Sequence, residues 1–201
     1  MQLNILGVQA WAYGKPTRYY AFVSSMLDHD AAYTISVMQD FMNEITAVYT
    51  GIERVTLWSD VGPHFRASRF MAWWLCRLPA SMGMQFTFNM HPPGHGKGDV
   101  DGFFGRLRRG KDEAAQESEL WTKREYCLQL QRVFDSQKER NPASAEIRMI
   151  DYEPAPKDVI PAFFFNTTEL ADAGMGVKSC FLMWASPTAC SKAMTSLMDS
   201  A

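Results

Sequence analysis

Apolar and polar residues alternate with strand spacing at the start of the chain. The alternation predicts strands over residues 2–10 and 18–26, the second rich in Tyr, Phe and Val. Between them, Gly14-Lys15-Pro16-Thr17 is a turn signal, because glycine and proline supply the backbone angles that tight turns need. We therefore expect the two strands to pair as a hairpin.

Further along, the apolar spacing changes to that of helices and back. Apolar residues from Ile35 to Ile45 recur at helical spacing, which predicts a helix with Asp28 or Asp30 as its N-cap. The same reasoning predicts, in order, a strand over 54–58, a helix over 64–78 stopped by Pro79, a strand over 83–90, a glycine-punctuated helix after residue 94, a long polar helix over 111–138 and a strand over 147–152.

This order of elements predicts the fold class. Strands that alternate with helices after an initial hairpin are typical of an α/β fold, here a mixed sheet flanked by helices over residues 1–140. Asn141-Pro142 marks a boundary. We expect residues 141–201 to be a C-terminal extension, to which the pattern assigns no compact domain.

Composition excludes several classes of protein. With 201 residues, 47% of them hydrophobic, the chain can build a core, which excludes a disordered tail or a collagen-like fibre. A net charge of −2 excludes a uniformly basic coat protein, so any nucleic-acid contact must come from a local patch. The four cysteines form no C-x-x-C pair, and no apolar run approaches the ~20 residues that cross a bilayer. We expect an intracellular protein without a membrane partner.

Two aspartates occupy positions at which proteins with α/β sheets commonly bind their ligands. Asp60 directly follows the strand over 54–58, so its carboxylate should point into the crevice at the carboxyl end of the sheet. Enough chain for a helix, a strand and a turn separates it from Asp101, which can thereby return beside it. Two adjacent carboxylates repel unless a cation lies between them, and hard oxygen ligands suit Mg²⁺ or Mn²⁺. We expect Asp60 and Asp101 to be catalytic metal ligands in a phosphoryl transfer.

A plainer interpretation of both aspartates stays open. An aspartate after a strand more often shapes a turn or caps a helix than binds a metal. Asp101 alone would by default be an exposed helix residue. A zinc site at His64, His91, His95 and Cys76 is not indicated, because their spacing fits no common finger.

A local excess of basic residues surrounds and follows Asp101. Between Lys97 and Lys111 there are five basic and only two acidic side chains. Such groups hold phosphate backbones, so we expect this run to contact DNA, although an ordinary solvated helix face is the alternative. The expected nucleic-acid-binding residues are His95, Lys97, Arg106, Arg108, Arg109 and Lys111.

Two strings resemble those of known DNA-processing enzymes. Ser59-Asp60-Val61-Gly62-Pro63-His64-Phe65 resembles the Ser-Asp-Asn-Gly-Pro-x-Phe string of retroviral-type integrases and related transposases. The more specific string is similar to a pattern of transposon-derived proteins of the ribonuclease-H-like superfamily; it is His95-Gly96-Lys97-Gly98-x-x-Asp101-Gly102-x-x-Gly105-x-x-Arg108-Arg109. The resemblance covers residues 1 to about 112. It implies a ribonuclease-H-like fold and metal-dependent DNA cleavage and joining, with Asp60 as the second and Asp101 as the third acid.

The chain departs from that family pattern in three ways. Phe104 stands where such proteins often carry glycine, and the third acid is aspartate rather than glutamate. The family's first strand supplies the first acid, yet residues 1–27 contain no Asp or Glu. We therefore expect that the chain begins at the family's second strand, with weak or no catalysis on its own.

Three functions follow as hypotheses. The first is a transposase- or integrase-like strand-transfer domain, truncated at its first strand, with DNA as its partner and Mg²⁺ or Mn²⁺ as its cofactor. The second is a non-catalytic nucleic-acid-binding or assembly module that keeps the fold and the basic helix. The third is a ribonuclease-H-like nuclease with another substrate. A DNA partner favours the nucleus over the cytoplasm, and a second copy of the chain is a further candidate partner.

Overall fold

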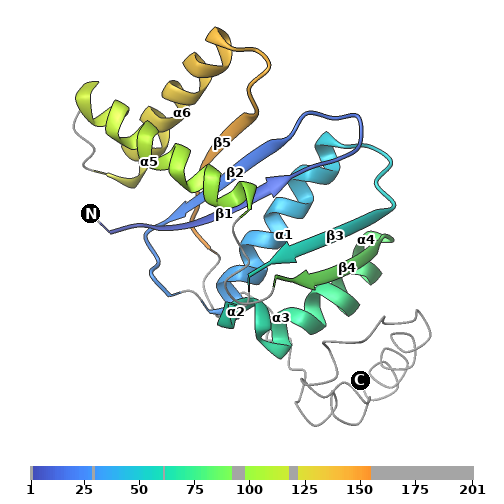
Figure 1. Ribbon diagram of the computed structural model, residues 1–201. Coiled ribbons are helices and arrows are strands. Elements are labelled where there is room, and N and C mark those ends of the chain that lie inside the picture. Colours follow the sequence, from blue (N-terminus) through green and yellow to red (C-terminus); the bar gives the residue numbers. More distant parts are fainter. Residues whose placement is uncertain (1, 29, 61, 92–97, 118–121, 155–201) are drawn as a thin grey trace, which may run out of the picture. The chain divides into compact units, whose positions relative to one another are not determined.

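The computed structural model describes residues 2–28, 30–60, 62–91, 98–117 and 122–154, which form a mixed α/β structure (Figure 1). The described chain divides into two compact units. The first unit holds residues 2–28 and 98–154, and the second holds residues 30–91. The α/β class expected from the sequence is confirmed.

A three-stranded mixed sheet forms the centre of the first unit. β1 (Asn4–Ala10) and β2 (Arg18–Ser24) pair antiparallel as the predicted hairpin, and β5 (Glu146–Asp151) pairs parallel with the other edge of β2. β2 is the middle strand, and all its residues except Arg18 are buried, which agrees with its almost continuous apolar sequence. The strand predicted over 147–152 is present and begins and ends one residue earlier. It follows the boundary predicted at residue 141, yet it lies in the same sheet as the hairpin.

Two long helices, α5 (Asp99–Glu117) and α6 (Lys123–Arg140), cover one face of this sheet (Figure 1). Every third or fourth residue of α5 points inward, as the periodicity of an amphipathic helix requires. The buried residues that build this core come from β2, α5, α6 and β5, and Ile5 of β1 packs against them while only partly buried. The buried set includes Tyr19, Val23, Phe103, Leu107, Ala114, Leu130, Phe134 and Ile147.

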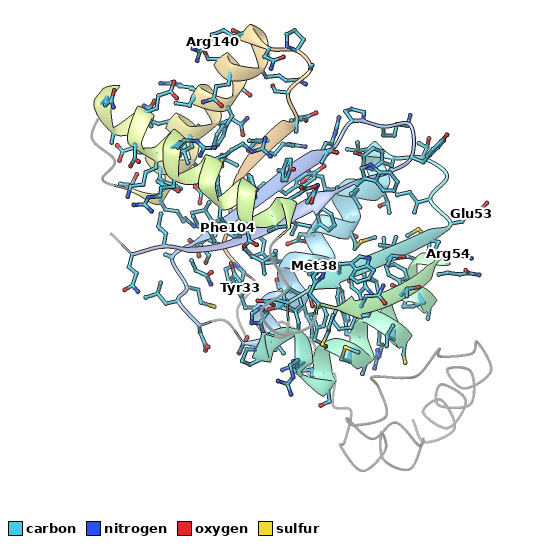
Figure 2. All side chains as sticks on the ribbon, in the orientation of Figure 1. Tyr33, Met38, Glu53, Arg54, Phe104 and Arg140 are labelled. Atoms are coloured by element: carbon cyan, nitrogen blue, oxygen red, sulfur yellow. The ribbon has the colours of Figure 1, made fainter. Side chains whose placement is uncertain are left out.

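Two glycines let the elements of the first unit approach closely. A Cβ at Gly7 of β1 would lie 2.9 Å from the Phe104 ring, so the absence of a side chain makes room for that ring (labelled in Figure 2). A Cβ at Gly110 of α5 would likewise lie 2.9 Å from the Phe134 ring of α6. These glycines set the spacing of α5 against β1 and α6.

The long helix predicted over 111–138 is wrong as a single element. α5 continues through residue 111 and ends at Glu117, and α6 begins anew at Lys123. A capping box starts α6: the Thr122 hydroxyl accepts from the N–H of Glu125, whose carboxylate accepts from the N–H of Thr122. The Thr-x-x-Glu signal is visible in the sequence, but the even mixture of charges around it favoured an uninterrupted helix.

The second unit begins with the predicted helix α1 (Ala31–Val48). Asp30 is its N-cap, because its side chain accepts a hydrogen bond of 2.8 Å from the N–H of Tyr33. Apolar residues along one face of α1 are buried, among them Tyr33 and Met38, which Figure 2 labels. Both the helix and one of its two candidate caps are confirmed.

A parallel two-stranded sheet, β3 (Arg54–Ser59) and β4 (Gln85–Met90), completes the second unit. A broken helical segment connects the strands: α2 (Pro63–Arg66), α3 (Ser68–Ala72), the π-helix η1 (Trp73–Arg77) and α4 (Leu78–Met82). Aromatic rings of this segment pack on the sheet, with Phe70 against Phe88 and Trp74 against Phe86.

The predicted helix over 64–78 is therefore wrong in its continuity and in its end. Pro79 does not stop it, because the chain widens into a π-helix in which the N–H of Leu78 donates to the carbonyl of Trp73. Pro79 then occupies the first turn of α4, where its missing N–H costs no hydrogen bond. The segment ends at Gly83, whose φ of 65° is left-handed. Among the described residues, every helix is too short or too polar to span a bilayer.

Candidate functional site

Asp60 lies directly after β3, at the carboxyl end of the parallel pair. Its Oδ1 accepts a hydrogen bond of 3.1 Å from the N–H of Gly62, which forms a tight turn into α2. A Cβ at Gly62 would lie 3.0 Å from this oxygen and 2.8 Å from the His64 ring, so a side chain there would have to displace those side chains. The Asp60 carboxylate is exposed, and its second oxygen makes no hydrogen bond to a described residue.

An imidazole and an indole lie at the same end of β3 and β4. The N–H of His91 donates to the carbonyl of Ser59 at 2.9 Å, so the strand pairing continues one residue past β4. The His91 ring centroid is 5.2 Å from that of Trp58, which is 58% exposed. Asp60 and these two rings form an exposed polar and aromatic edge of the second unit.

Asp101 lies in the first turn of α5 and is exposed. Its Oδ2 accepts a hydrogen bond of 3.1 Å from the N–H of Gly98, which satisfies one of the free donors at the helix start. The negative charge also interacts favourably with the positive end of the helix dipole. One carboxylate oxygen of Asp101 makes no hydrogen bond to a described residue.

Both aspartates therefore have the local roles that the plainer interpretation assigned to them, Asp60 in a turn and Asp101 at a helix start. Asp60 belongs to the second unit and Asp101 to the first. Their pairing around a metal ion stays a prediction. Within the described ranges, no three His, Cys, Asp or Glu side chains are grouped so that they could hold a metal ion.

Four basic residues of α5, which we call the basic band, lie within two helical turns: Arg106, Arg108, Arg109 and Lys111. The acidic residues of α5 lie on either side of the band, in the first turn and from Asp112 onward. Arg108, Arg109 and Lys111 are exposed, and none forms an ion pair or side-chain hydrogen bond with the described residues. Four of the six expected nucleic-acid-binding residues thus lie on α5, and their contact with nucleic acid stays a prediction; His95 and Lys97 lie outside the described residues.

Arg106 differs from the rest of the band. Its guanidinium carbon lies 4.3 Å from the centroid of the Tyr19 ring on β2, a cation–π contact. The Phe103 ring stacks on the same tyrosine, with centroids 4.9 Å apart. Arg106 is half-buried and fixes α5 to the sheet, so we assign phosphate contact first to the three exposed members. The sequence pattern does not indicate this contact, because it joins residues far apart in the chain.

An ionic cluster around Lys123 holds the start of α6 to the end of β5. Its ammonium group pairs with Asp151 at 2.8 Å and with Glu153, and donates to the carbonyl of Tyr152. Burial opposes the charged form, but the hydrogen bonds to Asp151 and Glu153 outweigh it and raise the pKa of Lys123. Burial raises the pKa of the neighbouring Cys127 thiol to about 11 and that of Tyr126 to about 12. These neutral buried groups are structural, and neither is a nucleophile at neutral pH.

The comparisons with known proteins give one match. A family model matches residues 2–156, about three-quarters of the chain, and is described as a domain of unknown function, DUF8701. No curated protein and no solved structure matches the chain. The matched region includes both aspartates and the basic band.

Proposed function

The chain belongs to the DUF8701 family, and we propose that it is a DNA-binding domain of transposase or integrase type that holds DNA on the basic band of α5. The resemblance of residues 59–65 and 95–109 to transposase and integrase strings supports this partner. A nuclear location belongs to the same proposal.

The observation that carries the proposal is the charge distribution along α5. Phe103, Leu107 and Ala114 are buried in the core and fix the helix to the sheet, while Arg108 and Arg109 extend into solvent without a described partner. Cations that have no carboxylate to satisfy them are available for phosphate oxygens. Binding through such groups releases counterions from DNA, so it depends steeply on salt.

Two double variants test this surface at equal net charge. Arg108→Ala/Arg109→Ala removes two charges from the band, and Arg124→Ala/Arg132→Ala removes two exposed charges from α6. Fluorescence anisotropy with a labelled duplex should show a loss of about tenfold or more for the first variant and a much smaller loss for the second. Equal losses of affinity in both variants would mean that net charge alone causes the loss, and would refute the assigned surface.

A second candidate function is metal-dependent strand cleavage, and one observation favours it. Asp60 lies at the carboxyl end of a parallel strand pair, the edge at which α/β sheets bind their ligands. Asp60 and Asp101 each keep one carboxylate oxygen that makes no hydrogen bond to the described residues, so each can offer a ligand oxygen to Mg²⁺ or Mn²⁺. The ion would polarise the phosphate under attack, and the carboxylates would position it.

A plasmid-nicking assay tests the second candidate. Nicking of supercoiled DNA that requires Mg²⁺ or Mn²⁺ and disappears in both Asp60→Asn and Asp101→Asn would support cleavage. Because residues 2–27 offer no carboxylate as a first acid, we expect little or no nicking by this chain alone. If the plasmid stays unaltered while duplex binding depends on salt, cleavage by this chain is refuted and DNA binding remains as its function.

A further inference from the structure

The loop between β1 and β2 exposes two aromatic side chains. Trp11 is 71% exposed and Tyr13 is 93% exposed, whereas most aromatic residues of the first unit are buried. Among the described residues, neither ring is paired with another aromatic ring or with a cation. Exposing two large aromatic faces to water is unfavourable, and such exposure often marks a binding site. We call residues 11–17 the hairpin loop.

A tight turn holds the hairpin loop in shape. The N–H of Lys15 donates to the carbonyl of Ala12 at 3.1 Å, and Gly14 has a φ of 69°. A left-handed glycine at the third position of a hydrogen-bonded turn is the mark of type II. Tyr13 then stands at the corner of the turn, and its outward direction is imposed by the backbone.

The hairpin loop lies at the same end of the hairpin as the start of α5 and Arg106. Gln9 and Tyr19 face each other in the second-last pair of the hairpin before the loop. The Gln9 side chain donates to the carboxylate of Asp99 at 3.2 Å, and the Arg106 guanidinium covers the Tyr19 ring. Along α5, the exposed part of the basic band begins roughly 14 Å from Asp99, at 1.5 Å per residue.

We propose that the hairpin loop binds unpaired bases of DNA by stacking them on Trp11 and Tyr13. This inference rests on the proposed DNA-binding function and assigns its preferred substrate, a duplex with an adjoining unpaired strand. In that arrangement the three exposed members of the basic band hold the duplex backbone, and Lys15 lies where the backbone of the unpaired strand passes.

The chemistry of the loop favours a nucleobase. Every base has a flat π-face that stacks on an aromatic ring, whatever the sequence, whereas bases within a duplex already stack on one another. The loop carries Lys15 and no carboxylate, so a phosphate next to a stacked base meets a cation. Two rings two residues apart suit two bases of one strand.

Two probes and two double variants test the proposal. The probes are a blunt duplex and the same duplex with an unpaired extension of about ten nucleotides, a length within the ~4–16 that single-strand sites cover. In Trp11→Ala/Tyr13→Ala, the affinity for the extended duplex should fall about tenfold or more, and that for the blunt duplex should stay unchanged. The matched control, Trp11→Phe/Tyr13→Phe, should keep most of the affinity because phenylalanine still offers ring faces. A 2-aminopurine in the extension should lose fluorescence on binding to the natural chain and to the control, but not to the alanine variant.

The outcomes separate the two proposals. If the natural chain binds neither probe, the DNA-binding function fails. If it binds both probes equally, or if the alanine variant weakens both by the same factor, DNA binding stands and the stacking role of the hairpin loop is refuted.

Discussion

Replacing Gly110 with alanine should destabilise the first unit, although alanine is the better helix former. A Cβ at this position would lie 2.9 Å from Cζ and 3.1 Å from Cε1 of Phe134. Carbon atoms attract one another best at about 3.5–4.0 Å, so the ring or the helix must move by roughly half an ångström or more. Phe134 is only 4% exposed and is packed within the core, so its neighbours must move as well.

Two opposing effects set the magnitude. Alanine in place of glycine within a helix gains about 1 kcal/mol, while overpacking a core costs about 1–3 kcal/mol. The net loss in the free energy of unfolding should be about 1 kcal/mol. Gly102 provides the matched control, because it lies in the same helix and a Cβ there meets no atom within 4 Å. Gly102→Ala should therefore gain up to about 1 kcal/mol, which leaves a difference of about 2 kcal/mol between the variants.

Urea denaturation followed by circular dichroism measures both variants. In thermal unfolding, 1 kcal/mol corresponds to about 2–4 °C for a chain of this size. Phe134→Leu combined with Gly110→Ala should lose less than the sum of the single changes, because the smaller side chain relieves the contact. Equal stability of Gly110→Ala and Gly102→Ala would refute the inferred approach of α5 to α6.

Two further predictions concern the cluster that joins α6 to β5. Lys123→Met should lower the free energy of unfolding by about 1–2 kcal/mol in chemical denaturation, because Asp151 and Glu153 lose their shared cation. Arg140→Met, which breaks an exposed pair, should change it by no more than about 0.5 kcal/mol, and equal losses would contradict this account. Stability should also fall as the pH rises from 9 to 11, because the folded chain retains the Cys127 proton to a pKa of about 11 whereas the unfolded chain releases it near 9.0. Cys127→Ala should flatten this decline, and a stability that rises with pH would contradict the assigned pKa.

Local signals predicted the elements whose formation depends on nearby residues. The hairpin follows from alternation and from the glycine turn at residue 14, and α1 follows from its apolar stripe and from Asp30. In these elements the hydrogen bonds and the buried face lie within one short segment. The sequence pattern alone was therefore enough to place them.

Other features depend on contacts between distant residues. The π-helix before Pro79 brings Trp74 onto Phe86, and Arg106 covers Tyr19 from another element. No residue spacing indicates such pairs. The exposure of Trp11 and Tyr13 likewise does not follow from the apolar pattern, although two aromatic residues beside a glycine turn are visible in the sequence.

The site residues illustrate both cases. The basic band was predicted because its charges are adjacent along one helix, and the structure leaves three of them exposed. The pairing of Asp60 with Asp101 concerns residues of two different units, so it stays a prediction. Their contacts to the N–H groups of Gly62 and Gly98 match the plainer role that aspartate has in turns and helix starts.

The salt dependence of duplex binding tests the central claim most directly. If Arg108 and Arg109 each neutralise a phosphate, the plot of log binding constant against log salt concentration should be shallower for Arg108→Ala/Arg109→Ala by about 1.8, or 0.9 per contact. The α6 control, Arg124→Ala/Arg132→Ala, should keep the slope of the natural chain. Equal slopes for all three proteins, or binding that does not depend on salt, would contradict the assignment of α5 as the DNA-contacting helix.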